Sequence, residues 1–299
     1  MHYSRVCLAL LLLSLGGGAL AITAAAPQPL VRIDHIPLAV RDLDRAAMDY
    51  RHLGFTIKPG RFHADGIRNM HVKFSNGAGI ELITAAAPGD ALTRQYRVLL
   101  AQGEGPAFVG FYTPDLRALE RRLAAAGIAY TLEHDLLVFP DPALAWAFVF
   151  GTPNLAPNDK PEYFRHPNTA GATLGIWIAV HDEAPMLRLF RALGAHIERK
   201  TVFAPDPVSA DIATVSESGK VIFLPASRQI LPGRRIVGII LQTKHLDALA
   251  RKLRAAGVVP AATRQTRAYR SVFLGPRDTH GVWLEFREPG RMHSDRNGT

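Results

Sequence analysis

The chain has 299 residues, 48% of them hydrophobic and 20% charged, which is typical of a globular protein and ample for buried cores. Its formal net charge of +9 comes from basic residues spread singly or in pairs, such as Arg121 and Arg122, with no long basic run. This distribution indicates solvated helix faces, so we expect no nucleic-acid partner and at most a preference for acidic small molecules.

Residues 1–26 have the pattern of an export signal. Arg5 gives a basic start, residues 6–15 form an apolar run, and small residues follow it. The run is far shorter than a membrane-spanning helix, so we predict a periplasmic or secreted protein without stable membrane insertion. The single cysteine, Cys7, lies inside this signal, and the remaining chain cannot form a disulfide.

A repeated pattern follows the signal. Four amphipathic helical segments each end in a glycine, the residue favoured at a helix C-terminus. They span residues 43–54, 116–127, 183–194 and 246–257. A short run with strand character precedes each helix, at residues 33–40, 108–112, 174–180 and 236–241. About three further extended segments, separated by turn residues, follow each helix. The sequence therefore predicts an α+β fold of four βαβββ modules that form two curved mixed sheets.

The modules divide into two halves. Residues 30–150 hold the first two modules and residues 173–288 hold the last two. Residues 151–172 are rich in Pro and Asn and are predicted to be a linker, and residues 289–299 are predicted to be a disordered tail.

The first module carries residues that resemble a known superfamily. A βαβββ unit with His35 on its first strand and Glu81 on its last resembles the vicinal oxygen chelate superfamily, which includes glyoxalase I, extradiol dioxygenases and bleomycin-resistance proteins. The segments that resemble its glyoxalase-like-domain branch are residues 34–35, 39–44, 53–55, 59–63, 69, 80–82 and 165–170. The third and fourth modules depart from the pattern, because Gly175 and Gly238 stand where His35 stands in the first.

In such a unit the first and last strands are neighbours, so His35 and Glu81 can converge on one divalent ion, which the residue types do not distinguish among Zn, Mn, Fe, Co and Ni. A catalytic site usually needs a third protein ligand. We expect Glu285 to supply it, because Glu285 takes the place of Glu81 in the fourth module and pairing of the first module with the fourth would bring the two together. If the first module pairs with the second instead, His63 or His71 would have to take part.

Each candidate also has a structural interpretation. His35 could be a hydrogen-bonded core histidine, while Glu81 could pair with Arg61 or Arg68. Four further residues are candidates for contact with substrate, although the last could instead cap backbone groups in the linker. They are His63, Asn69, His71 and His166.

The resemblance implies a divalent-metal-dependent lyase or isomerase that acts on a small vicinal-oxygen substrate, with Glu285 or Glu81 as the base. The alternatives are a metal-free protein that sequesters a small molecule and, with less support, an extradiol-type dioxygenase. A homodimer is compatible with the sequence.

Overall fold

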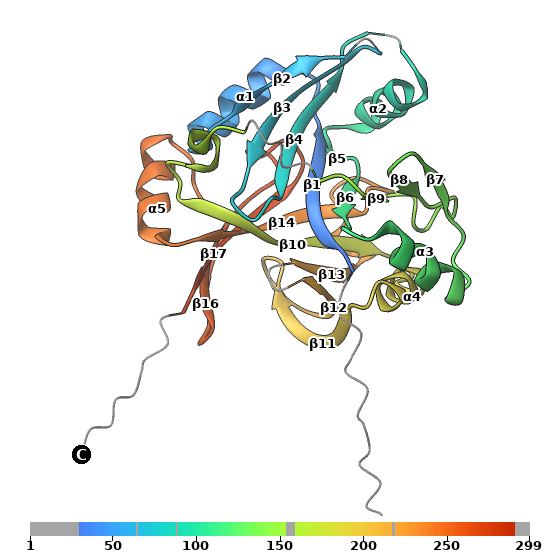
Figure 1. The fold of residues 1–299 in the computed structure, drawn as a ribbon. Helices are drawn as coiled ribbons and strands as arrows, with labels where there is room; N and C mark the ends of the chain where they lie inside the picture. The colour runs from blue at the N-terminus through green and yellow to red at the C-terminus, as the bar shows by residue number, and fades with distance from the viewer. Residues whose placement is uncertain (1–29, 64, 88, 154–158, 217–218, 291–299) are drawn as a thin grey trace, which may run out of the picture.

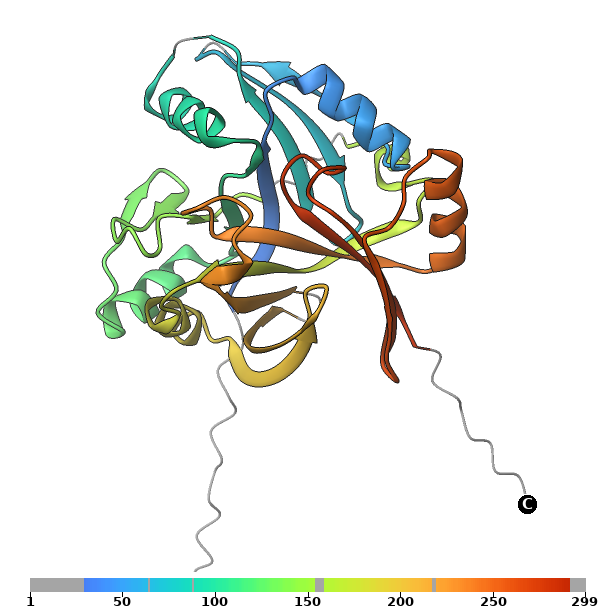
Figure 2. The same cartoon turned by 180° about the vertical axis from the view of Figure 1, so that it is seen from behind.

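Two curved mixed sheets, one from each half of the chain, form the protein (Figures 1 and 2). The computed structural model describes residues 30–63, 65–87, 89–153, 159–216 and 219–290. The predicted export signal and residues 291–299 of the predicted tail lie outside the described residues. No helix in the described part of the chain is long and apolar enough to span a membrane.

The first module has the predicted order of one strand, one helix and three strands. Its elements are β1 (Arg32–Ala39), α1 (Leu43–His52), β2 (Lys58–Phe62), β3 (Ile67–Lys73) and β4 (Gly79–Ala85). Helix α1 begins at Asp42, whose carboxylate accepts a bond from the backbone N–H of Arg45 at 2.9 Å. Gly54, just beyond its C-terminal end, adopts a φ of 86° that favours glycine. Strand β1 pairs with β4 in parallel, as predicted for first and last strands.

A helix outside the repeat separates the first two modules. It is α2 (Ala91–Gln102), and the short β5 (Gly105–Pro106) follows it. The second module then contains β6 (Val109–Tyr112), α3 (Leu116–Ala125), β7 (Thr131–Glu133), β8 (Leu136–Val138) and β9 (Ala147–Phe150). The repeat analysis did not identify α2, because this helix has no counterpart in the other modules.

The second half repeats the arrangement. The third module contains β10 (Ala170–Val180), α4 (Ala184–Ala192), β11 (His196–Phe203), β12 (Pro207–Ser216) and β13 (Gly219–Pro225). The fourth contains β14 (Ile236–Thr243), α5 (Leu246–Ala255), β15 (Ala262–Gln265), β16 (Tyr269–Leu274) and β17 (Trp283–Pro289). A 3-10 helix, η2 (Ala226–Arg228), connects them.

Consecutive modules share a sheet. In the first sheet the strand order is β2-β3-β4-β1-β6-β9-β8-β7, and in the second it is β11-β12-β13-β10-β14-β17-β16-β15. The junction between modules is the antiparallel pair β1–β6 in the first half and β10–β14 in the second. The expected pairing of the first module with the fourth is therefore wrong for the sheets.

The first and fourth modules nevertheless meet on the helix-covered sides of the sheets. Phe55 stacks on Phe286 with ring centroids 5.9 Å apart, and the Tyr50 hydroxyl donates to the Thr279 carbonyl. The second and third modules meet similarly, since Phe111 packs against Phe190 and α3 lies beside α4 in both views (Figures 1 and 2). One hydrophobic cluster, here called the shared core, therefore joins all four modules.

Alternation along the strands leaves a second face on each sheet. In the first sheet, Ile36, Leu38, Ile80 and Leu82 enter the shared core, so His35 and Glu81 lie on the opposite face, here called the site face. Helix α2 covers one end of the site face, where Tyr96 packs with Ile83 and Phe108. In the second sheet the corresponding face carries an apolar cluster that includes Trp177, Ile240 and Phe273.

Part of the segment between the halves packs against the first sheet. It contains the 3-10 helix η1 (Pro161–Phe164), and β10 begins inside the predicted linker at Ala170. Asn168 is fully buried and donates a side-chain bond to the Leu53 carbonyl at 3.0 Å. This part of residues 151–172 is therefore built into the fold.

Candidate functional site

His35 and Glu81 converge on the site face, as the sequence predicts. His35 Nε2 lies 3.6 Å from Glu81 Oε2, and the side chains are 16% and 14% exposed. That separation is too long for a hydrogen bond. Two ligand atoms that each lie about 2.1 Å from one ion are roughly 3 to 3.6 Å apart, so the pair fits a shared divalent ion.

Asp34 fixes the orientation of His35. A β-bulge between Ile33 and His35 shifts the register against β6, and the Asp34 carboxylate approaches His35 Nδ1 to 2.9 Å. With Nδ1 bound to this carboxylate, the lone pair of neutral His35 lies on Nε2 and faces Glu81. Burial lowers the pKa of His35, but the Asp34 hydrogen bond and the charges of Glu81 and Asp34 outweigh it and raise that pKa.

Glycine at position 110 makes room for the His35 ring. Gly110 is the neighbour of His35 across the β1–β6 pair, and a Cβ on it would lie 2.8 Å from His35 Cε1. The ring also packs against Phe150, with centroids 5.4 Å apart. The second module thus contributes the space and the aromatic contact that place the imidazole.

Asn69 holds the second oxygen of Glu81. Its Nδ2 donates to Glu81 Oε1 at 2.6 Å and lies 3.4 Å from His63 Nε2, while its Oδ1 accepts from the Arg61 backbone N–H. This arrangement explains how the partly buried carboxylate is satisfied without an arginine. The alternative partner Arg68 pairs with Asp44 instead.

His71 lies beside Glu81 on the neighbouring strand. The two residues are directly opposite in the β3–β4 pair, and His71 Nδ1 is buried with no hydrogen-bond partner among the described residues. Burial is the main cause that lowers the pKa of His71 to about 4, so its imidazole is neutral near pH 7. His63, Asn69 and His71 therefore all lie near His35 and Glu81, and their contact with substrate stays a prediction.

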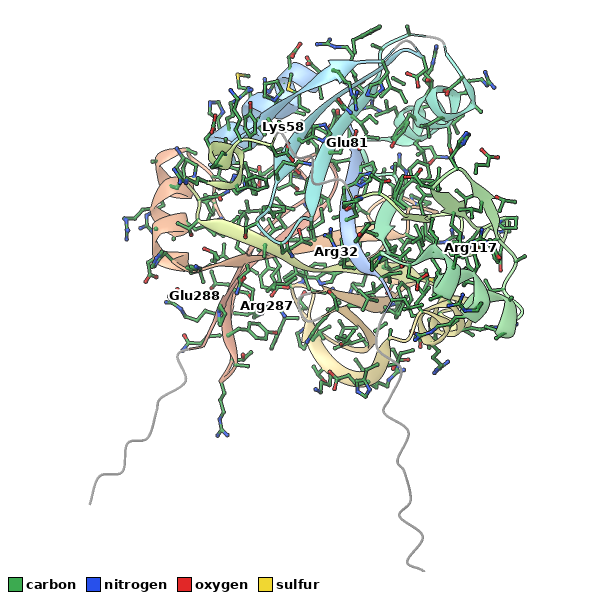
Figure 3. The ribbon with its side chains drawn as sticks, viewed as in Figure 1. Arg32, Lys58, Glu81, Arg117, Arg287 and Glu288 are labelled. Carbon is green, nitrogen blue, oxygen red and sulfur yellow. The ribbon has the colours of Figure 1, made fainter. Side chains whose placement is uncertain are left out.

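Glu285 does not join this site. It lies on β17 in the second sheet, fully buried, where Arg287 Nε and Nη2 donate to it at 2.8 and 2.9 Å and Ser271 Oγ at 2.6 Å. Burial raises the pKa of Glu285, although Arg287 and Ser271 favour the charged form. Figure 3 shows Arg287 far from Glu81. The prediction that Glu285 is a metal ligand or base is wrong, and the carboxylate is instead half of a buried ion pair.

A local signal distinguishes the two glutamates. Arg287 follows Glu285 by two residues on the same strand, so alternation places both on one face, whereas Ile83 holds that position after Glu81. A strand Glu with an Arg two residues later has an internal partner. This pattern could have identified Glu285 as structural.

His166 is also structural. It is 7% exposed, its Nδ1 accepts from the Thr56 backbone N–H at 3.0 Å, and its Nε2 donates to the Lys73 carbonyl at 2.9 Å. Both ring nitrogens are used by the backbone. The predicted substrate contact at His166 is therefore wrong, and the capping interpretation is confirmed.

Sequence reasoning missed two lysines and an aspartate beside the pair. Lys58 and Lys73 lie on the site face and both contact the Asp159 carboxylate, Lys73 at 3.2 Å. Lys73 alternates with His71 and Asn69 on β3, and this run of polar residues on one face is a signal that could have identified it. Nothing local in the sequence identifies Asp159, because it comes from the segment between the halves.

The fold and the sequence together assign the family. The profile of the glyoxalase-like domain family matches residues 33–194, more than half of the chain and the part that contains the site. The chain belongs to this family, within the vicinal oxygen chelate superfamily. A search of curated proteins finds no match.

Solved structures share the fold at low sequence identity. A mutant of 4-hydroxymandelate synthase from Streptomyces coelicolor is 11% identical with a TM-score of 0.65, covering 88% of this chain and 93% of that one. A catechol 2,3-dioxygenase is 14% identical with a TM-score of 0.55, and the match covers 90% of this chain and 96% of the dioxygenase. A fusion of a xylose isomerase-like TIM barrel with 4-hydroxyphenylpyruvate dioxygenase is 11% identical with a TM-score of 0.62. The match covers 91% of this chain but only 51% of the fusion protein, so this chain spans about half of its length.

Proposed function

We propose that the protein is a divalent-metal-dependent lyase or isomerase that acts on a small substrate with two vicinal oxygens. The observation that carries the proposal is the 3.6 Å approach of His35 Nε2 to Glu81 Oε2, with Asp34 holding Nδ1. A carboxylate–histidine pair of this kind is the usual support of a metal-binding imidazole. Export of the protein remains a prediction from residues 1–26.

Each residue of the site has a separate role in the proposed reaction. When bound, a divalent ion supplies Lewis-acid polarisation of the two substrate oxygens. His35 and Glu81 would hold it, Asp34 keeps the imidazole in the right tautomer, and Asn69 orients the Glu81 carboxylate. Glu81 is also the carboxylate placed to take a proton from a carbon beside the substrate oxygens.

Metal content tests the first half of the proposal. Full-length protein purified without chelator should contain about one transition-metal ion per chain, and His35→Ala and Glu81→Gln should lose it. Glu285→Gln is the control, since it removes a buried carboxylate from the other sheet and should keep the ion. Failure of the wild type to bind any ion after reconstitution would exclude this proposal.

Proton exchange tests the second half. Hydroxyacetone carries vicinal oxygens and an exchangeable C–H, so incubation in D₂O with the metal-loaded protein should introduce deuterium that NMR detects. The exchange should be absent with Glu81→Gln. Metal-loaded protein that shows no exchange with any vicinal-oxygen compound would remove the lyase or isomerase assignment while leaving the metal site intact.

One observation favours a second function, a metal-free binding protein. Within the described residues, no group of three or more His, Cys, Asp and Glu side chains is placed to hold a metal ion. The pair would then serve as hydrogen-bonding groups for a sequestered ligand. The metal analysis above separates the two functions. The dioxygenase alternative has less support, because a two-His-one-carboxylate set is not assembled in the described part of the site.

A further inference from the structure

Two lysines lie on the site face beside His35 and Glu81. Lys58 on β2 is opposite His71 on β3, which is opposite Glu81 on β4. Lys73 on β3 is opposite Gly79 on β4, which is opposite His35 on β1. Opposed residues share a face, and adjacent strands are about 4.8 Å apart, so each lysine is anchored roughly 10 Å from a residue of the pair. Lysine side chains are long enough to bring their charges toward it, and Figure 3 shows Lys58 and Glu81 on this sheet.

Both lysines hold a carboxylate from elsewhere in the chain. Lys73 Nζ lies 3.2 Å from Asp159 Oδ2, and Lys58 Nζ contacts Oδ1. The exposed fractions of the side chains are 1% for Asp159, 4% for Lys73 and 22% for Lys58. One buried and one partly exposed ammonium group that both contact one buried carboxylate form an anion site.

Asp159, whose carboxylate occupies this anion site, lies on neither β2 nor β3. Asp159 comes from the segment between the two halves and stands just before η1 (Pro161–Phe164), outside any helix or strand. Its backbone is therefore part of neither sheet. Replacing it by a carboxylate of a ligand conserves the local charge, so the exchange avoids leaving a buried cation unpaired.

We propose that Lys58 and Lys73 form the carboxylate subsite of the His35–Glu81 site, and that Asp159 occupies this subsite when substrate is absent. The substrate class is then a small acid with vicinal oxygens at one end and a second carboxylate at the other. This inference rests on the proposed function for the oxygen-binding end only. Asp159 acts as an internal competitor that the substrate carboxylate displaces.

Matched ligands test the subsite. Lactate and malate both carry a 2-hydroxycarboxylate, but only malate has a second carboxylate, and 2-hydroxyglutarate places that group one methylene further away. Isothermal titration calorimetry on metal-loaded full-length protein should show malate or 2-hydroxyglutarate binding at least about tenfold more tightly than lactate, as one additional charge-assisted contact predicts.

Variants assign the difference to the proposed residues. Asp159→Asn removes the competing charge at nearly constant volume and should widen the ratio of lactate to dicarboxylate dissociation constants. Lys73→Met should reduce the ratio to near one, and Lys58→Met, at a partly exposed position, should do the same if Lys73→Met does not fold. Lys244→Met, remote on the second half, should leave the ratio unchanged.

The outcomes separate this inference from the proposed function. Equal dissociation constants for lactate and both dicarboxylates, in the wild type and in Asp159→Asn, would overturn the subsite even if the protein holds its metal ion. A lysine-dependent preference for dicarboxylates in protein that never binds metal would support the subsite and reject the metal-dependent function.

Discussion

A single glycine sets the position of the proposed metal-binding imidazole. Gly110 lies under the His35 ring, and an added methyl group would be 2.8 Å from His35 Cε1 and 3.0 Å from Phe150 Cε2. Neither ring can move far, because Asp34 holds the imidazole on one side and the β6–β9 pair holds Phe150. The backbone at this position is therefore part of the site.

We predict that Gly110→Ala lowers metal affinity at least about tenfold, because the displaced ring can no longer present Nε2 beside Glu81. Its free energy of unfolding should fall by only about 1–3 kcal/mol, the usual range for overpacking. Metal titration and thermal unfolding measure the two effects. Gly171→Ala is the control, since a methyl group there meets nothing within 4 Å, and equal metal affinities in the two variants would contradict the prediction.

His166 predicts a pH dependence of stability. Burial lowers its pKa below the ordinary value of 6.5, despite the bond to the Lys73 carbonyl, so the folded protein keeps it neutral where the unfolded chain binds a proton. Its contribution to stability is present above pH 6.5 and falls as the pH decreases toward the folded-state pKa.

Comparison with His166→Gln isolates this contribution from the other histidines. The variant should lose about 2 kcal/mol above pH 7 through its two backbone hydrogen bonds, and this deficit should shrink as the pH falls below 6.5. Urea unfolding at several pH values measures it. A deficit that is constant from pH 8 to pH 5 would show that the folded protein binds a proton at His166 as readily as the unfolded chain.

At the scale of elements, local patterns predicted most of the fold. The four helix–glycine segments and their preceding strands correspond to α1, α3, α4 and α5 with β1, β6, β10 and β14. These elements follow from periodicity and capping, which are local. The pairing of modules depends on contacts between distant segments, so the sequence could not decide it.

Helix α2 shows what a repeat analysis overlooks. Asp90 caps its start by accepting from the Thr93 backbone N–H at 2.8 Å, and Gly103 ends it, so both end signals were present. The contacts that hold α2 in place come from a residue far away in the sequence. Arg234, 6% exposed and preceding β14, donates to the carbonyls of Leu99 and Gly103 at the end of α2 and to Gly105 and Pro106 of β5.

We predict that Arg234→Met destabilises the protein by about 2–4 kcal/mol, because the carbonyls at the end of α2 lose their buried donor. Hydrogen exchange should accelerate most in α2, which covers one end of the site face. The neighbouring Arg235 makes one exposed bond, to the Pro142 carbonyl, so Arg235→Met should cost less than about 1 kcal/mol. Unchanged protection in α2 would refute the attachment.

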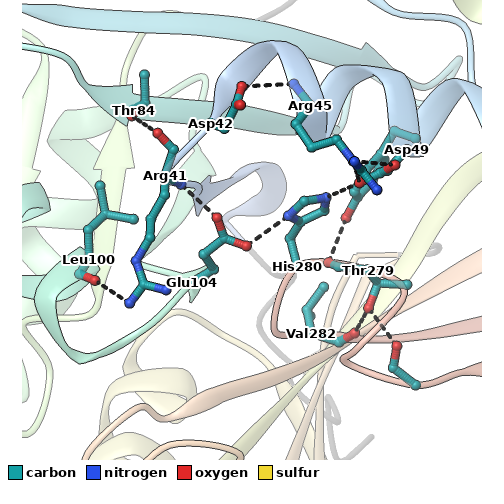
Figure 4. A network of polar contacts seen from close by, with 12 residues as sticks. Arg41, Asp42, Arg45, Asp49, Thr84, Leu100, Glu104, Thr279, His280 and Val282 are labelled. Carbon is teal, nitrogen blue, oxygen red and sulfur yellow. Dashed lines mark hydrogen bonds and ion pairs between the residues drawn. The ribbon is translucent and has the colours of Figure 1, made fainter.

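At the scale of the whole molecule, the first and fourth modules are tied together by polar contacts as well as by the shared core. His280, between β16 and β17, contacts Glu104 at 2.8 Å and Asp49 at 3.2 Å, and Glu104 also accepts from the Arg41 backbone N–H (Figure 4). The network joins α1, the end of α2 and the last loop of the second sheet. Neither half buries its helix-covered side alone.

We therefore predict one cooperative unfolding transition for the full chain, followed equally by near- and far-ultraviolet circular dichroism. A fragment of residues 30–150 should not fold stably, because it exposes the residues that meet the second half, such as Phe55 and Phe111. Two separate transitions, or cooperative unfolding of the isolated fragment, would show that the halves are independent domains.

The shared core has a consequence for the gene. Every residue of the proposed site is encoded in roughly the first half of the reading frame, yet the core that supports it is completed by β17 near the end. A premature stop codon late in the frame should therefore remove the function although it leaves every site codon intact. Selection for the function of the site should therefore also conserve codons for residues that lie far from it.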